Sequence, residues 1–184
     1  LNNELTIDRD FGFFGYGNWM VGQSKFNLKT AFTTGEGRGG LPGNNGLAYT
    51  GRLEWLPFGV FKGGGDYSEG DLAYERRVKL AVAAGVSNNL GATRAGGQLG
   101  QELFAPRDLF TTMADAVIKY RGWALSQEYI SREVDAPVVY NNDSSAFQVV
   151  YKGAGHNTQL SYCFKSGHEL AMRYTRMLPH ADIQ

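Results

Sequence analysis

The sequence predicts an all-β protein built from antiparallel strands. Apolar and polar residues alternate with a period of two through most of the chain. Gly (25 residues) and aromatic residues (13%) are abundant, whereas Pro is scarce (5 residues). The connections between these segments are alternately short and long, and the long connections are polar. The alternation marks strands with one apolar and one polar face, and the composition suits strands and turns better than long helices.

Eight or nine strands are expected. The first, 11–21, is rich in Phe, Tyr, Trp and Gly, and its faces cannot be assigned from alternation. The others follow at 24–34, 47–56, 80–86, 114–120, 123–132, 147–151, 159–164 and 169–174. Pro57 ends the third strand because it cannot donate to a ladder. Apolar residues fall on odd positions in 147–151 and on even positions in 160–164, so a turn or bulge is expected over 152–157.

The connections alternate in length. Short breaks lie at 22–23, 122 and 166–167, and long polar stretches lie at 35–46, 88–108 and 133–144. Outer-membrane barrels have tight turns at one end and long loops at the other. We therefore expect the three long stretches at one end of a barrel, facing the outside of the cell. The segment 59–78 stands where a short turn is expected, so we interpret it as an extra hairpin or a folded-in loop.

Several classes of protein are disfavoured. The chain has 18 basic and 18 acidic residues, which argues against a nucleic-acid partner. No run approaches the roughly 18 apolar residues of a spanning helix, and a single Cys163 provides no internal disulfide. No catalytic constellation or phosphate loop is apparent, and His156, His168 and His180 are not expected to bind a metal. We therefore expect no enzymatic activity, no metal and no cofactor.

Alternation alone would also fit a soluble β-sandwich. Two features favour a transmembrane antiparallel barrel instead. Strand lengths near ten residues match a tilted span of the hydrocarbon layer. Aromatic residues also cluster near strand ends, where an interfacial girdle needs them: Trp19, Trp55, Tyr120, Trp123 and Tyr174.

Several motifs resemble the phosphate-selective porin O and P family of outer-membrane barrels. The most specific are GRLEWLPFG at 51–59 and GDLAYE at 70–75. Supporting pieces are DRDFGF at 8–13, KYRG at 119–122, QLSY at 159–162 and ELAMRYT at 169–175. Their order and spacing also look like that family, and the resemblance spans nearly the whole chain.

The resemblance implies an up-and-down barrel of about sixteen strands in the bacterial outer membrane, with a water-filled, anion-favouring lumen, often as a homotrimer. The chain is too short for sixteen strands, so 1–184 is expected to be a single region from the middle to the C-terminal part of a longer barrel. A small barrel of eight strands is the alternative, although side chains would fill its interior.

Charged residues opposite the apolar face are the candidate lumen residues. Nine basic and four acidic residues fall there, and a basic lumen would favour anions. The pairs Arg52 with Glu54 and Arg121 with Glu128 could instead be purely structural. The residues proposed to line the pore are Lys25, Lys29, Arg52, Glu54, Lys119, Arg121, Glu128, Arg132, Glu169 and Arg173.

The expected function is passive diffusion of small solutes, with anions favoured and phosphate-like ions among them. Expected partners are outer-membrane lipids, small anions or other small solutes, and further copies or an envelope complex. Two alternatives remain open at this point: a non-conducting structural barrel in a larger envelope complex, and a soluble β-sandwich binding module. Extraction behaviour and single-channel conductance would separate the three.

Overall fold

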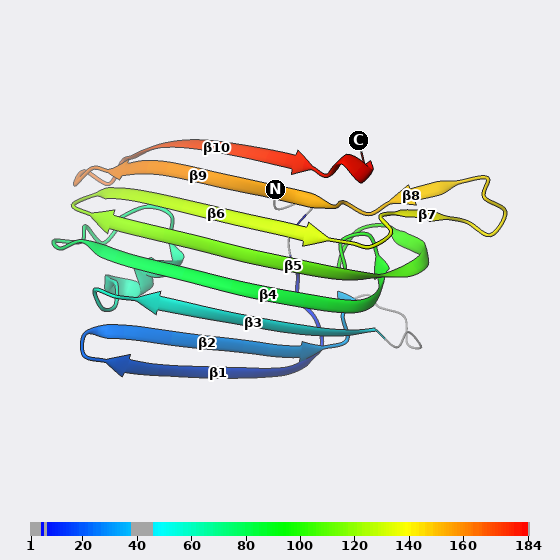
Figure 1. The fold of residues 1–184 in the computed structure, drawn as a ribbon. Coiled ribbons are helices and arrows are strands. Elements are labelled where there is room, and N and C mark those ends of the chain that lie inside the picture. Colours follow the sequence, from blue (N-terminus) through cyan, green and yellow to red (C-terminus); the bar gives the residue numbers. More distant parts are fainter. Residues whose placement is uncertain (1–4, 6, 38–45, 184) are drawn as a thin grey trace.

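A computed structural model describes residues 5, 7–37 and 46–183 and has an all-β fold (Figure 1). Eight strands form one antiparallel sheet in the order β1-β2-β3-β4-β5-β6-β9-β10. Their bounds are β1 Gly12–Val21, β2 Ser24–Thr33, β3 Leu47–Leu56, β4 Lys79–Arg94, β5 Glu102–Tyr120, β6 Trp123–Glu133, β9 Gly153–Cys163 and β10 Glu169–Pro179. Strands β7 (Val138–Tyr140) and β8 (Phe147–Val149) pair separately, and the 3-10 helices are η2 (Lys62–Tyr67) and η3 (Ala181–Ile183). The all-β, antiparallel prediction is confirmed.

The large sheet is an open meander over the described residues. Each strand pairs with its neighbours along the chain, except that β6 pairs with β9 across the β7–β8 hairpin. Strands β1 and β10 are the two edges and do not pair with each other. Among the described strand pairs, register shifts occur only at the far end of the β4–β5 pair, between Asn89 and Arg94.

The connections segregate to opposite ends of the sheet (Figure 1). One end, here called the turn end, holds the tight β1–β2 and β5–β6 turns, the β9–β10 turn and the long β3–β4 connection. The other, the loop end, holds the β2–β3, β4–β5 and β6–β9 connections, although residues 38–45 of the first lie outside the described residues. Gly22 (φ 60°) and Gly122 (φ 92°) supply the left-handed backbone that the two tight turns need. The β4–β5 and β6–β9 connections lie at one end, as expected from the sequence, but the long β3–β4 connection lies at the opposite end with the tight turns.

The expected loop at 88–108 is wrong over most of its length. Strand β4 continues to Arg94 and β5 starts at Glu102, so only 95–101 form the connection. Asn and Gly are frequent in this stretch and suggest a loop, but cross-strand pairing overrides their weak strand propensity. The hairpin therefore projects beyond its neighbours at the loop end.

The β6–β9 connection contains structure that the sequence reading placed differently. The expected loop at 133–144 includes β7, and the expected strand at 147–151 is the short β8, paired with β7 outside the large sheet. The turn or bulge expected over 152–157 is wrong, because β9 begins at Gly153. The change of parity arises because β8 and β9 belong to different sheets.

A small apolar cluster joins this hairpin to the projecting ends of β4 and β5. Its buried members are Ala92, Leu103, Leu109, Val134, Val139 and Val150. The Gln148 side chain also accepts a hydrogen bond from Phe104 N and donates one to Glu102 O. The hairpin is thus held to the loop end of β5.

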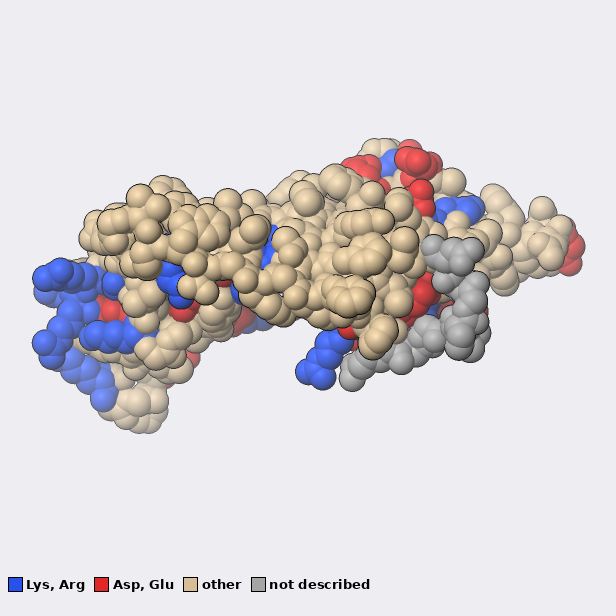
Figure 2. Space-filling model, turned by 90° about the horizontal axis from the view of Figure 1, so that it is seen from below, with Lys and Arg blue, Asp and Glu red and all other residues tan. Residues whose placement is uncertain are grey.

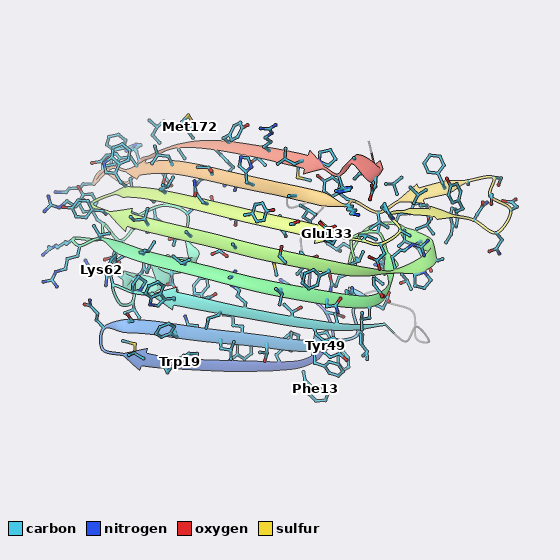
Figure 3. All side chains as sticks on the ribbon, in the orientation of Figure 1. Phe13, Trp19, Tyr49, Lys62, Glu133 and Met172 are labelled. Atoms are coloured by element: carbon cyan, nitrogen blue, oxygen red, sulfur yellow. The ribbon has the colours of Figure 1, made fainter. Side chains whose placement is uncertain are left out.

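The two faces of the large sheet differ sharply. One face, here the outer face, carries apolar side chains that no second layer covers within the described residues; Phe13 is 81% exposed and Met172 73% exposed (Figure 3). The other, the inner face, carries Lys29, Arg52, Glu54, Asp115 and Lys119, among others. The predicted separation of apolar and charged residues between faces is confirmed. No helix in the described part of the chain is both long and apolar enough to cross a membrane.

Candidate functional site

The β3–β4 connection, residues 57–78, folds back over the inner face and is called the infolded loop here. Its residues form hydrogen bonds or ion pairs with side chains of β2, β3, β5 and β10. Of the two sequence interpretations, an extra hairpin and a folded-in loop, the second is right. The loop contains η2 and no strand.

Local sequence explains why the loop turns inward. Pro57 ends β3, and Phe61 then packs into a buried cluster with Leu56 and Val117. Gly63 (φ 58°) and Gly64 (φ 71°) adopt left-handed conformations that let the chain turn within η2. Burial of Phe61 thus draws the chain across the turn end of the inner face.

Asp71 fixes the far side of the loop. Its carboxylate accepts hydrogen bonds from Glu75 N (3.0 Å) and from Gly122 N in the β5–β6 turn (2.7 Å). The residue is only 1% exposed. Because a buried carboxylate is costly without donors, these backbone bonds tie the loop to the end of the sheet.

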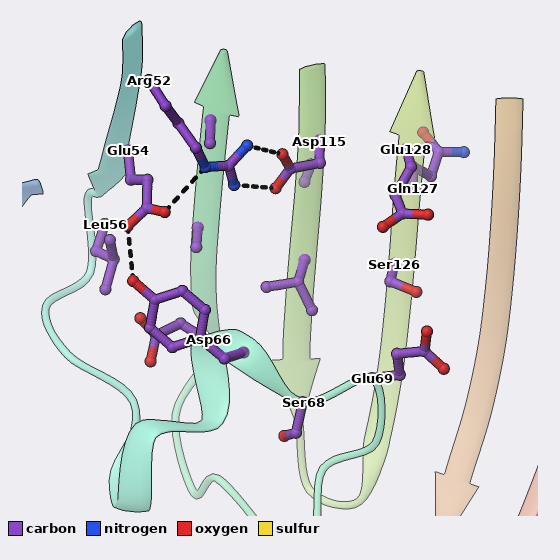
Figure 4. Close-up of a pocket in the computed structure, with 15 residues that line it drawn as sticks. Arg52, Glu54, Leu56, Asp66, Ser68, Glu69, Asp115, Ser126, Gln127 and Glu128 are labelled. Atoms are coloured by element: carbon purple, nitrogen blue, oxygen red, sulfur yellow. Dashed lines mark hydrogen bonds and ion pairs between the residues drawn. The ribbon is translucent and has the colours of Figure 1, made fainter. Parts of the chain in front are cut away.

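A network of charges lies under the loop on the inner face (Figure 4). The Arg52 guanidinium donates two hydrogen bonds to Asp115, of 2.5 and 3.0 Å, and one of 3.0 Å to Glu54. Glu54, 4% exposed, also accepts from Lys29 Nζ over 2.8 Å. Two carboxylates and two cations from β2, β3 and β5 therefore compensate one another, in a bidentate geometry that orients the guanidinium.

Tyr67 links the loop to this network. Its hydroxyl donates to Glu54 Oε2 over 2.8 Å and accepts from Lys29 Nζ over 2.9 Å. Partial burial raises the pKa of the Tyr67 phenol; Lys29 lowers it, Glu54 raises it, and the net effect is a pKa above its ordinary value. The hydroxyl therefore keeps its proton and remains a donor near neutral pH.

Two hollows flank the infolded loop. One, of about 340 Å³, is lined on its polar side by Arg52, Glu54, Glu69, Asp115 and Glu128 (Figure 4). The other, of about 390 Å³, lies toward β1 and β2, where Tyr16, Asn18, Lys25 and Lys29 line it. The first is open and polar enough to hold water and small hydrophilic solutes.

The structure brings several of the predicted lumen residues together. Lys29, Arg52 and Glu54 form the network, and the predicted Arg52–Glu54 pair is confirmed. Arg173 lies farther along the inner face, donating to Gln159 Oε1 over 2.7 Å and to Glu69 of the infolded loop over 2.5 Å. Glu128 accepts from Asn157 Nδ2 over 3.1 Å, so the suggested Arg121–Glu128 pair is absent from the described ion pairs.

Other predicted residues lie away from the open part of the inner face. Arg121 stands in the β5–β6 turn with φ 49°, exposed, its guanidinium 5.1 Å from the Tyr120 ring. Lys119 and Arg132 are on the inner face but each is only 1% exposed. Lys119 donates to Ser68 Oγ and Gly70 O of the infolded loop, and Arg132 to Gly96 O at the loop end. Lys25 and Glu169 lie at the turn end of β2 and β10.

Sequence reasoning missed the contributions of the infolded loop. Tyr67, Ser68 and Glu69 contact residues 13, 51 and 104 positions away in the chain. No local pattern marks such contacts. The only hint in the sequence was the excess length of 59–78 where a short turn was expected.

The arrangement offers a hydrated, charged surface. The ion pairs of the inner face lie side by side. The described residues around them include no Ser–His–acid triad of a hydrolase. Among the described residues, no group of His, Cys, Asp and Glu has the geometry of a metal site. No family model, no curated protein and no solved structure matches the chain. The resemblance to phosphate-selective porins therefore remains a prediction from the sequence motifs.

Proposed function

We propose that the chain forms part of the wall of an outer-membrane porin, a water-filled β-barrel through which small solutes diffuse passively. The observation that carries the proposal is the two-faced sheet. The eight strands of the large sheet expose an apolar outer face over their whole width, while charged and polar groups gather on the opposite face. A barrel wall needs this distribution, because lipid contacts one face and water the other.

Strand geometry also supports a barrel in lipid. Six of the eight strands, β1, β2, β3, β6, β9 and β10, have 10 or 11 residues. That length spans the hydrocarbon layer when strands tilt.

The strand ends are staggered in the manner of tilted barrel strands. When the paired residues are followed from each strand to the next, Trp19 of β1 is in register with Tyr174 of β10. Trp19 lies two residues from the turn end of β1 at Val21, whereas Tyr174 lies five residues from the turn end of β10 at Glu169. Closure of a sheet into a barrel requires this kind of cumulative offset. In the proposed barrel, β1 and β10 pair with further strands, because unpaired edges are costly in lipid.

The charge network favours a weak rather than a strong ionic selectivity. Lys29 and Arg52 are compensated by Glu54 and Asp115, and Arg173 is compensated by Glu69. The basic surplus counted from the sequence is therefore smaller at the open surface, and we propose a slight preference for anions. Phosphate specificity would need a ring of uncompensated donors, and these pairs do not supply one.

Planar-bilayer recording tests the proposal. Full-length protein purified in detergent should give stepwise ionic currents, and heat-denatured protein should give none. A protein that stays in solution without detergent and shows no conductance would overturn it in favour of a soluble binding module. A protein that inserts without conducting would favour the second candidate, a structural barrel, which the infolded loop across the inner face supports.

A further inference from the structure

Exposed basic side chains gather at the turn end of the molecule (Figure 2). They come from three connections that are distant in sequence but meet at this end: the infolded loop, the β5–β6 turn and the β9–β10 turn. The five exposed residues, here called the basic rim, are Lys62, Arg76, Arg77, Arg121 and Lys165. None of them forms an ion pair with another described residue.

Acidic residues of the same connections point inward. Asp71 and Glu75 are 1% and 3% exposed, and backbone N–H groups hold their carboxylates. Glu69 is exposed but pairs with Arg173 on the inner face. The connections thus contain both signs of charge, yet their solvent-facing surface is predominantly positive.

Aromatic side chains place the basic rim at a defined depth. Trp19, Phe26 and Trp55 stack across β1, β2 and β3 on the outer face, with ring centroids 5.5 and 6.3 Å apart. At the turn ends of β6 and β9, the ring centroids of Trp123 and Tyr162 are 4.8 Å apart. Trp and Tyr prefer the boundary between hydrocarbon and headgroups, so side chains just beyond them lie at the level of lipid phosphates.

We propose that the basic rim is a binding surface for anionic phospholipid headgroups of the leaflet at the turn end. The inference rests on the proposed membrane-spanning function and adds a lipid partner to it. Lys and Arg near an anionic surface gain from its negative potential, and Arg also donates bidentate hydrogen bonds to phosphate. Phospholipid is favoured over a soluble acidic partner because the basic rim and the aromatic girdle lie at the same end of the sheet.

The three tryptophans make the test direct. Trp19, Trp55 and Trp123 are the only tryptophans of the sequence and all lie near the turn ends of their strands. Full-length protein is reconstituted in phosphatidylcholine bilayers that contain a trace of dansyl-labelled phosphatidylglycerol or, in parallel, dansyl-labelled phosphatidylcholine. Energy transfer from tryptophan to dansyl reports the local enrichment of each lipid.

We expect more transfer to the labelled phosphatidylglycerol, and a decline as salt is raised, because salt screens the rim. The double variant R76Q/R77Q should reduce the preference roughly 5- to 30-fold, given about 1 kcal/mol for each basic residue near an anionic surface. Neither side chain forms a hydrogen bond or ion pair with a described residue, so the fold should persist. The matched control R9Q/R176Q removes the same charge from exposed positions nearer the loop end and should leave the preference unchanged.

Two further arms separate the possible failures. Quenching of the tryptophans by brominated phosphatidylcholine in neutral bilayers tests insertion alone. Quenching without any preference for phosphatidylglycerol overturns the lipid inference and leaves the porin proposal standing, whereas absence of quenching overturns both. Loss of the preference on adding inorganic phosphate, but not sodium chloride of equal ionic strength, would show a soluble-anion site instead and would also overturn the inference.

Discussion

The Tyr67 hydroxyl donates a 2.8 Å hydrogen bond to Glu54 Oε2 and thereby fastens the infolded loop to β3. Glu54 also accepts hydrogen bonds from Lys29 and Arg52, so it does not depend on this donor alone. The bond therefore controls the position of the loop more than the integrity of the sheet.

Replacing Tyr67 with Phe should loosen the infolded loop and raise conductance. The substitution removes the hydroxyl's bonds to Glu54 and Lys29, which contribute about 1 kcal/mol net each, so the population of displaced loop should increase roughly 5- to 30-fold. Single-channel recording of Y67F measures the effect. Tyr140, exposed in β7 at the loop end, provides the control Y140F, which should conduct like the unmodified protein. Equal conductance of Y67F and the unmodified protein would mean that the loop does not obstruct the solute path.

The Arg52–Asp115 pair should set the direction of ionic selectivity. D115N leaves Arg52 with excess positive charge in the hollow and should shift the reversal potential further toward anions, whereas R52Q should shift it toward cations. Each shift should be partial, because other charges act over the Debye length of about 10 Å at 0.1 M salt. D143N, on the tip of the β7–β8 hairpin, is the control. Identical reversal potentials for D115N and R52Q would show that ions do not pass near this pair.

Those two predictions depend on contacts that only the three-dimensional structure reveals. Alternation predicted β2 and β3 almost to the residue, because each strand has one polar and one apolar face. A residue that breaks strands also marks one boundary of each, Gly22 before β2 and Pro57 after β3. Alternation also placed Lys29, Arg52 and Glu54 on one face. It could not show that Lys119 lies beneath the infolded loop, since that depends on Ser68 and Gly70, about fifty positions away.

Loop and turn composition misled the sequence reading where pairing outweighs local preference. The 88–108 stretch is rich in Asn and Gly, yet Asn88 and Asn89 pair with Phe110 and Leu109 in β4 and β5. The prediction that Arg121 lies on the inner face extended the alternation of β5 one residue beyond the end of that strand at Tyr120. The chain reverses at Arg121, so its side chain belongs to the turn end and to the basic rim.

The outer face should tolerate no charge in the middle of a strand. Leu28 lies near the centre of β2 and is 40% exposed, so L28R should cost roughly 2 to 4 kcal/mol if lipid covers it. Leu72 in the infolded loop is 76% exposed, and L72R should change stability by less than about 0.5 kcal/mol. Urea unfolding in lipid vesicles gives both values. Equal, negligible costs for the two variants would indicate that water covers the outer face.

Asp10 should make the start of the β2–β3 connection sensitive to acid. Partial burial raises the pKa of Asp10, but hydrogen bonds from Thr33, Thr34, Phe11 N and Gly35 N lower it below its ordinary 3.8. Since the folded pKa is depressed, the stabilisation is present above that ordinary value and is lost as pH falls through the lowered pKa. Amide hydrogen exchange at Gly35 and Gly37, which donate to Asp10 over 2.6 and 3.1 Å, should accelerate in that range relative to the intrinsic rate.

A neutral cap elsewhere in the chain gives the control for acid sensitivity. Ala146 N donates to the Asn141 side-chain oxygen over 3.0 Å, and that oxygen does not titrate in the same range. Protection of Ala146 should therefore not follow the same pH profile. D10N should likewise remove the pH dependence at Gly35, and a persistent acid-induced loss in that variant would assign the effect to another group.

The loop end should face the outside of the cell and the turn end the periplasm, because long loops are the external connections of outer-membrane barrels. Cys163 is the only cysteine of the sequence and is 5% exposed, so C163S provides a clean background for labelling. In that background, N142C on the exposed β7–β8 hairpin should react with a membrane-impermeant maleimide on intact cells. S166C in the exposed β9–β10 turn should react only after the outer membrane is permeabilised. Labelling of S166C alone on intact cells would reverse the topology, and the basic rim would then meet the outer leaflet.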